Sequence, residues 1–121
     1  MGTIQHDAIL ITMSDLFVVP DTLKIHYRQE EGDFRLIDHL EHLAQVAGLG
    51  DLVLKQEKQS INGYRTLVIV PDGSKEYWTE SDDYNRARES FLESIKDLLC
   101  TVIVVSYGDL GNSVKELEDN V

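Results

Sequence analysis

The chain has 121 residues, of which 42% are hydrophobic and 27% are charged, a composition typical of one soluble globular domain. Asp and Glu together number 22 and Lys and Arg number 11, so the formal net charge at pH 7 is -11. This excess of acids argues against direct binding to nucleic-acid phosphates, which requires clustered basic side chains. We therefore expect a single acidic domain over residues 1–121 that makes no direct nucleic-acid phosphate contact.

Three features of the sequence predict a cytoplasmic protein. Cys100 is the single cysteine, so the chain lacks the internal disulfides typical of small secreted domains. The apolar run at residues 8–13 has no basic segment before it and is too short for the core of a signal peptide. No apolar stretch approaches the length that crosses a bilayer, so we expect no membrane association.

The first half of the chain predicts two strands and a helix. Residues 8–13 form an apolar run rich in β-branched side chains, typical of a strand buried on both faces. Apolar and polar residues alternate over residues 23–28, which predicts a strand with one wet face. A helix is expected to begin near Asp33 and to end at Gly48. Its apolar face consists of Leu36, Ile37, Leu40, Leu43, Ala44 and Ala47.

The second half predicts a three-stranded antiparallel meander, a second long helix and a further strand. The meander covers residues 52–78, with an Asn-Gly pair at residues 62–63 as a hairpin signal and a second turn at residues 71–73. Thr79 followed by acids predicts the start of the second amphipathic helix. Residues 101–107 resemble a buried strand, and residues 113–121 a short helix or a frayed tail.

These elements predict an α+β fold. We expect a mostly antiparallel sheet of about five to six strands in the order ββαβββαβ, with the two long helices packed on it. The element order resembles the ββαβββα plan of longin, roadblock and profilin-like domains over most of the chain, and the final strand departs from that plan. The alternative is a ferredoxin-like βαββαβ core over residues 23–107, which differs in whether residues 75–78 pair as a strand.

Residue types that could support catalysis or metal binding are scattered along the chain. His39 and His42 stand three residues apart on the first helix and could share a metal ion, but no further ligands accompany them. We therefore expect two solvated histidines on its polar face. Cys100 follows the second helix, where the helix dipole opposes a thiolate, so it is expected to be a buried, inert thiol. The sequence predicts no catalytic residue, no metal and no cofactor.

The candidate partner-binding residues are an aromatic pair followed by acids: Tyr77, Trp78, Glu80, Asp82 and Asp83. Aromatic side chains supply apolar contact area, and carboxylates select a basic partner. Because neighbouring strand residues point to opposite faces, one of Tyr77 and Trp78 is expected in the core and the other at the surface. The alternative is that Trp78 simply anchors the second helix to the sheet.

The sequence favours a small cytoplasmic binding or regulatory protein, such as an inhibitor, immunity factor, adaptor or chaperone, that contacts a basic protein partner. One alternative is a small-molecule-binding domain or metal-independent enzyme with a pocket at a sheet end near Ser14, His26 or Asp109. Another is a DNA mimic, with carboxylates spaced like phosphates. A homodimer is also expected, through an apolar edge strand at residues 16–19.

Overall fold

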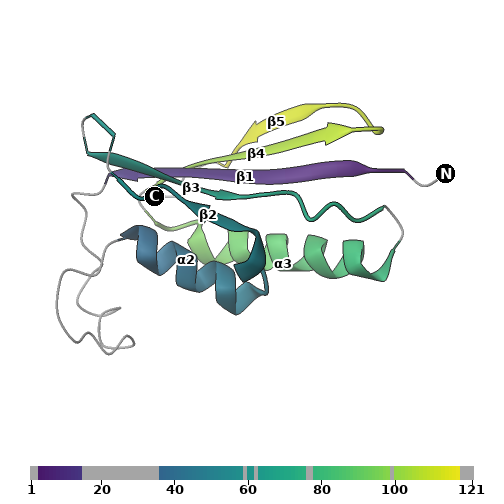
Figure 1. Ribbon diagram of the computed structural model, residues 1–121, viewed down its shortest axis with the longest axis horizontal. Helices are drawn as coiled ribbons and strands as arrows, with labels where there is room; N and C mark the ends of the chain where they lie inside the picture. Colours follow the sequence, from purple (N-terminus) through teal and green to yellow (C-terminus); the bar gives the residue numbers. More distant parts are fainter. Residues whose placement is uncertain are drawn as a thin grey trace.

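The computed structural model describes residues 3–14, 36–58, 60–61, 63–75, 78–98 and 100–117 of the chain. Within these residues, two helices lie on one face of a five-stranded antiparallel sheet, so the predicted α+β class is confirmed (Figure 1). The strands are β1 (Gln5–Ser14), β2 (Val53–Lys55), β3 (Tyr64–Ile69), β4 (Thr101–Gly108) and β5 (Ser113–Glu116), in the order β2-β3-β1-β4-β5. The helices are α2 (Leu36–Ala47), the short 3-10 helix η1 (Gly50–Leu52) and α3 (Thr79–Ile95).

The described elements from β1 to β4 follow the order βαββαβ, which is the order of the ferredoxin-like alternative. This core begins at β1, whereas the ferredoxin-like alternative was expected to begin at residues 23–28. Residues 23–28, and the expected edge strand at residues 16–19, lie outside the described residues. The expected third meander strand is not formed by Lys75 or Trp78, the two of its residues that the structure describes. The reason is topological, since β3 pairs with β2 on one side and β1 on the other and has no edge left.

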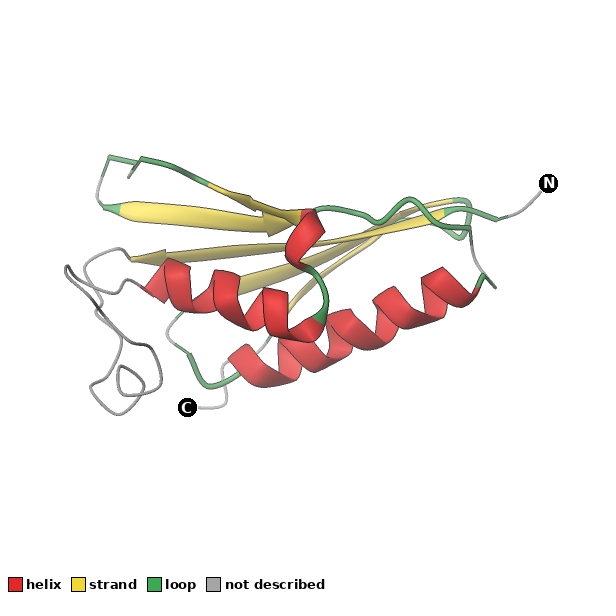
Figure 2. Cartoon of the chain, turned by 60° about the horizontal axis from the view of Figure 1, so that its bottom comes forward, coloured by secondary structure: helices red, strands yellow, loops and turns green. Residues whose placement is uncertain are grey.

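The sheet has an inner face, which the helices cover, and an outer face on the opposite side (Figure 2). In the central strand β1, Ile9, Ile11 and Met13 point inward and are buried, whereas Leu10 points outward and is 36% exposed. The prediction of a strand buried on both faces is therefore wrong. A continuous apolar run is compatible either with two covered faces or with one covered face and one open apolar face.

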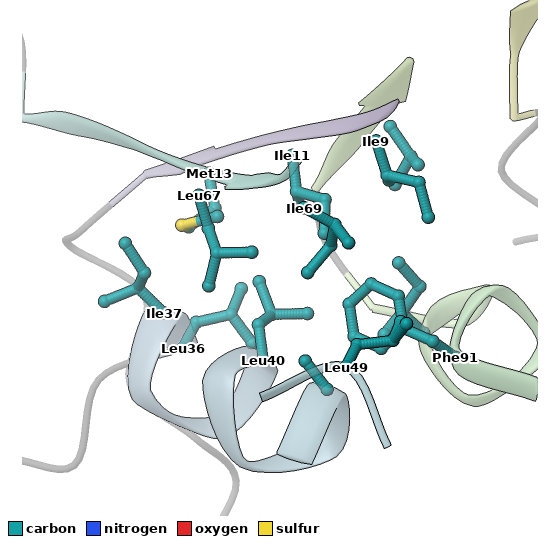
Figure 3. Packing of buried hydrophobic residues seen from close by; sticks show 13 residues of the cluster. Ile9, Ile11, Met13, Leu36, Ile37, Leu40, Leu49, Leu67, Ile69 and Phe91 are labelled. Atoms are coloured by element: carbon teal, nitrogen blue, oxygen red, sulfur yellow. The ribbon is translucent and has the colours of Figure 1, made fainter. Parts of the chain in front are cut away.

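The hydrophobic core lies between the inner face and the two helices (Figure 3). Leu36, Ile37 and Leu40 of α2 face the sheet, and Phe91 of α3 closes the core beside Leu49. The strands contribute Ile9, Ile11, Met13, Leu67, Ile69 and Val102. Each fully buried side chain of this size stabilises the fold by about 1.5–3 kcal/mol, so this cluster is the main source of stability.

Two turn signals in the sequence operate as predicted. Gly48 ends α2 with a φ angle of 95°, and the backbone N–H groups of Gly48 and Leu49 donate hydrogen bonds to the carbonyls of Gln45 and Ala44. Gly63, with a φ angle of 78°, lies in the connection between β2 and β3. These two strands pair as the predicted hairpin.

A strand, and not a short helix, follows β4. The chain turns at Gly111, with a φ angle of 100°, and β5 then pairs with β4 in a register that places Lys115 opposite Val104. The expected helix is therefore wrong for residues 113–116, and residues 118–121 lie outside the described residues. Without β5, β4 would expose a row of unpaired backbone groups, and strand pairing there outweighs the local helix-capping signal.

Candidate functional site

The predicted partner-binding residues lie at the start of α3. Trp78 directly precedes the helix in an extended conformation, and its carbonyl accepts a hydrogen bond from the backbone N–H of Asp82. Its side chain is 49% exposed, and Lys75 Nζ lies 5.6 Å from the centroid of its ring, within the range of a cation–π contact. Trp78 is therefore a surface residue, while Tyr77 lies outside the described residues.

The three predicted acids are exposed in the first two turns of α3. Glu80, Asp82 and Asp83 lie near the positive end of the helix dipole, where carboxylates are stabilised. Asp83 also forms an exposed ion pair with Arg86, with Oδ1 and Nη2 separated by 2.7 Å. Exposed pairs of this kind contribute little to stability. The structure thus brings the aromatic ring and the three carboxylates together at one end of a helix.

A hollow of about 420 Å³ lies between the end of α2 and the first half of α3. Its lining residues are Ala47, Gly48, Glu80, Asp83, Tyr84 and Ala87, and we call it the acidic groove. The four residues from α3 share one face because they are three or four positions apart. Tyr84 is partly buried against the core and forms a fixed wall, whereas the small side chains of Ala47 and Ala87 leave the groove open. Asp82 is not part of the lining.

Two sources make the acidic groove electrically negative. Glu80 and Asp83 contribute carboxylates from α3. The groove also receives the end of α2, whose last turn contains no basic residue, although two of its terminal carbonyls accept hydrogen bonds from Gly48 and Leu49, so a part of the negative charge of the helix dipole remains at that end. Arg86, which is ion-paired with Asp83, and the positive end of α3 offset part of this negative charge, and a positively charged side chain suits the charge that remains.

A second polar cluster, which we call the Arg88 cluster, is buried beneath α3. Arg88 Nη1 donates a hydrogen bond of 2.9 Å to Asp72 Oδ1, and Arg88 Nη2 donates one of 2.6 Å to Asn85 Oδ1. The carboxylate of Asp7 on β1 lies 3.7 Å from Arg88 Nη2. The cluster therefore joins α3 to the central strand and to the segment after β3, and its guanidinium is already occupied by protein partners.

Asp72 is the main counter-charge of Arg88. Burial raises the pKa of Asp72, but hydrogen bonds from Ser74 and Arg88 and the charge of Arg88 outweigh burial and hold this pKa below its usual value. The side chains of both Asp72 and Arg88 are more than nine-tenths buried. We interpret the cluster as a structural tie, because a buried pair of this kind fixes one arrangement of the elements it joins.

Sequence reasoning missed the Arg88 cluster, although a signal for it exists. Tyr84, Arg88, Phe91 and Ile95 are spaced by four, three and four residues, so Arg88 occupies a position of the apolar stripe of α3. A charged residue in such a stripe requires a buried partner of opposite charge. The identity of that partner, Asp72, could not be read from the spacing.

The two helix histidines differ in environment. His39 is buried, so the prediction that it is solvated is wrong, whereas His42 is exposed as predicted. Burial lowers the pKa of His39, and the nearby charge of His42 lowers it further. Cys100 is partly buried against the core. No group of three or more His, Cys, Asp or Glu residues in the described part of the chain could hold a metal ion.

The residues named for a pocket at a sheet end do not share one location. Ser14 is the last residue of β1, whereas Asp109 lies beside the start of β1, where its Oδ2 accepts a hydrogen bond of 2.9 Å from the backbone N–H of Ile4. Ten residues of β1, about 33 Å of extended strand, separate these two positions. His26 lies outside the described residues.

The chain was compared with protein families, with curated proteins and with solved structures, and none of these comparisons found a match. None of the described helices is long and apolar enough to cross a membrane.

Proposed function

We propose that the protein is a binding or regulatory protein without catalytic activity, and that it holds a basic segment of a partner protein in the acidic groove. The observation that carries this proposal is the groove itself, in which two carboxylates and the negative end of α2 surround a hollow of about 420 Å³. A lysine or arginine side chain is small enough to enter this hollow and suits its charge.

Trp78 supports the proposal because it offers an exposed aromatic ring at the start of the helix that lines the groove, without itself lining the groove. It precedes Glu80 by two residues, and about half of its side chain is exposed. Tryptophan is enriched among the residues that dominate binding energies, and its ring attracts cations, as the position of Lys75 shows. A partner cation would compete with Lys75 for this ring.

The net charge of -11 supports the choice of a basic partner, since a field of this sign raises the association rate of positively charged molecules. The single cysteine agrees with a reducing compartment such as the cytoplasm. Asp82 is exposed beside the groove without lining it, so its role in this proposal is to steer the partner.

The test is a pair of double variants that remove the same amount of charge from different places. Glu80→Gln with Asp83→Asn changes the groove, and Glu57→Gln with Asp97→Asn removes two exposed acids elsewhere. The probe is a nine-residue peptide rich in arginine and leucine, titrated by calorimetry at physiological salt. We expect the groove variant to bind at least about fivefold more weakly and the control to change less than twofold, because only the groove carboxylates contact the peptide.

Equal losses in the two double variants would mean that the peptide responds to the overall field alone, and the proposed groove would then be wrong. Trp78→Ala gives a second measurement on the same peptide. We expect it to accelerate dissociation, with a loss of about 2 kcal/mol of binding free energy if the ring is a dominant contact. The melting temperature should change little, because the side chain is half exposed.

A further inference from the structure

The outer face of the sheet carries a continuous apolar surface. The registers place Leu54, Val68, Leu10 and Ile103 opposite one another in a row that crosses β2, β3, β1 and β4. A second pair, Val105 and Val114, extends this surface over β4 and β5. Side chains that face each other across neighbouring strands are in contact range, so these six residues form one patch, which we call the outer patch.

The outer patch is accessible. Leu54 is 62% exposed and Val114 72% exposed, and even Leu10, in the middle of the central strand, is 36% exposed. Both described helices lie on the inner face, and no described element packs against the outer one (Figure 2). A contiguous apolar patch on an open sheet face is the usual mark of an interaction surface.

Charge is almost missing from the same face. Charged residues make up 27% of the chain. Among the strand residues that the registers place on the outer face, only Glu116, on the edge strand β5, is charged when His6 is counted as neutral. Four of the polar side chains on this face lie in pairs: Thr12 and Thr66 share a hydrogen bond of 2.9 Å, and the rings of His6 and Tyr107 are 5.1 Å apart. An antiparallel sheet that faces water ordinarily alternates apolar and strongly polar residues, and this one does not.

We propose that the outer patch binds the outer patch of a second copy of this chain, forming a dimer with twofold symmetry. A neutral, apolar face offers nothing that selects a basic partner, whereas two such faces are complementary to each other. Because the described strand residues of this face include a single charged one, two copies with a net charge of -11 each would meet there with little local repulsion. The dimer differs from the edge-strand dimer expected from residues 16–19, because the sheets stack face to face.

Distances between layers support this arrangement. Packed sheets lie about 10 Å apart, and a helix layer lies about another 10 Å behind each sheet, so the two acidic helix layers would be about 30 Å apart. The screening length at physiological salt is about 8 Å, so repulsion between these layers is largely screened. The acidic grooves, which belong to the helix layers, would stay accessible on opposite sides of the dimer.

The area of the face approaches what a specific contact between two copies needs. The strands are three to ten residues long, and at about 3.3 Å per residue and about 4.8 Å between strands they cover roughly 500 Å² of flat area. The relief of the side chains makes the accessible area larger than the flat area. The face is therefore close in size to the smallest specific interfaces, about 600 Å² per partner.

The test is sedimentation equilibrium of the full chain over a range of protein concentrations at 0.15 M and 0.5 M NaCl. We expect the mass to approach twice 13.7 kDa as the concentration rises. The higher salt should strengthen association, because it screens the repulsion between the acidic chains without weakening an apolar contact. A monomer at all concentrations and both salts would overturn the proposal and leave the outer patch to a different partner.

Leu10→Glu places a carboxylate at the centre of the outer patch, where two copies would face each other across the symmetry axis. We expect the dimer dissociation constant to rise at least tenfold. Val46→Glu is the matched control, because Val46 is 72% exposed on α2 and receives the same charge, and it should leave dimerisation unchanged.

Leu54→Glu, at a more exposed edge position, provides the same test if Leu10→Glu fails to fold, as judged by circular dichroism. A folded patch variant that dimerises like the control would place the interface elsewhere, for example at the edge of β5, and the proposal would be wrong.

Discussion

The two faces of the sheet differ in a way that inverts the usual distribution of charge. The inner face is covered by helices, yet charged residues lie within it, among them Asp7, which approaches the buried Arg88. The outer face is open, yet its strand residues are nearly free of charge. Burial and polarity are therefore separate properties of strand residues, since Ile9 and Leu10 are both apolar while only Ile9 is covered.

The largest expected effect comes from removing the charge on the covered side. Arg88→Met would leave the carboxylate of Asp72 buried without its counter-charge, and we expect the free energy of unfolding to fall by about 3–5 kcal/mol. Urea denaturation measures this change. The control is Arg86→Met, which breaks an exposed ion pair and should change stability by no more than about 0.5 kcal/mol. If both variants lower the free energy of unfolding by the same amount, the Arg88 cluster does not stabilise the contact between α3, β1 and the segment after β3.

A smaller effect is expected from neighbouring residues on the two faces of β1. Ile9→Ala opens a cavity in the core and should lower the free energy of unfolding by about 2–5 kcal/mol. Leu10→Ala changes an open position and should cost about 1 kcal/mol or less in the monomer. Chemical denaturation at protein concentrations below the dimerisation range measures both. A cost for Leu10→Ala as large as that for Ile9→Ala would show that the outer face is covered within a single chain.

The smallest effect concerns pH and the buried histidine of the helix layer. The pKa of His39 is lowered in the folded state, so between that pKa and the unfolded-state value of about 6.5 the unfolded chain binds more protons. Stability should therefore fall as the pH drops through about 6.5, and this dependence should end below the folded-state pKa. His39→Gln should flatten the dependence of the melting temperature on pH between about 7.5 and 5.5. A slope that His39→Gln leaves unchanged would remove the assignment to His39.

Local patterns in the sequence predicted local structure well. The helix from Thr79, the glycine that ends α2 and the hairpin between β2 and β3 all follow from spacing and turn chemistry. The position of the acids in the first turns of α3 follows from the same kind of local signal, because acids are favoured after a helix start. What could not be predicted depends on contacts between distant residues. Examples are the pairing of β3 with β1 and the partner of Arg88.

The exposure of the outer patch also could not be predicted from local sequence patterns. The apolar run of β1 is visible in the sequence. Whether its outward side chains are exposed depends on whether helices cover one or both faces of the five-stranded sheet, which the run itself does not indicate. His39 shows the reverse case, since it stands among polar neighbours in the sequence and is nevertheless buried. In both cases a residue's own type is a weak guide to its surroundings.

The position of β1 has a consequence for biosynthesis. Ile9 pairs with Ile69 on one side and with Val104 on the other, so the earliest strand in chain order is the centre of the sheet. A ribosome adding about 5–20 residues per second needs roughly 5–20 s to travel from β1 to the end of β4. During that interval the central strand of the sheet has no complete set of strand neighbours, and the sheet can close only after β4 has left the exit tunnel. Translation speed and chaperone supply are therefore expected to influence the yield of folded protein more than they would for a fold with sequential hairpins.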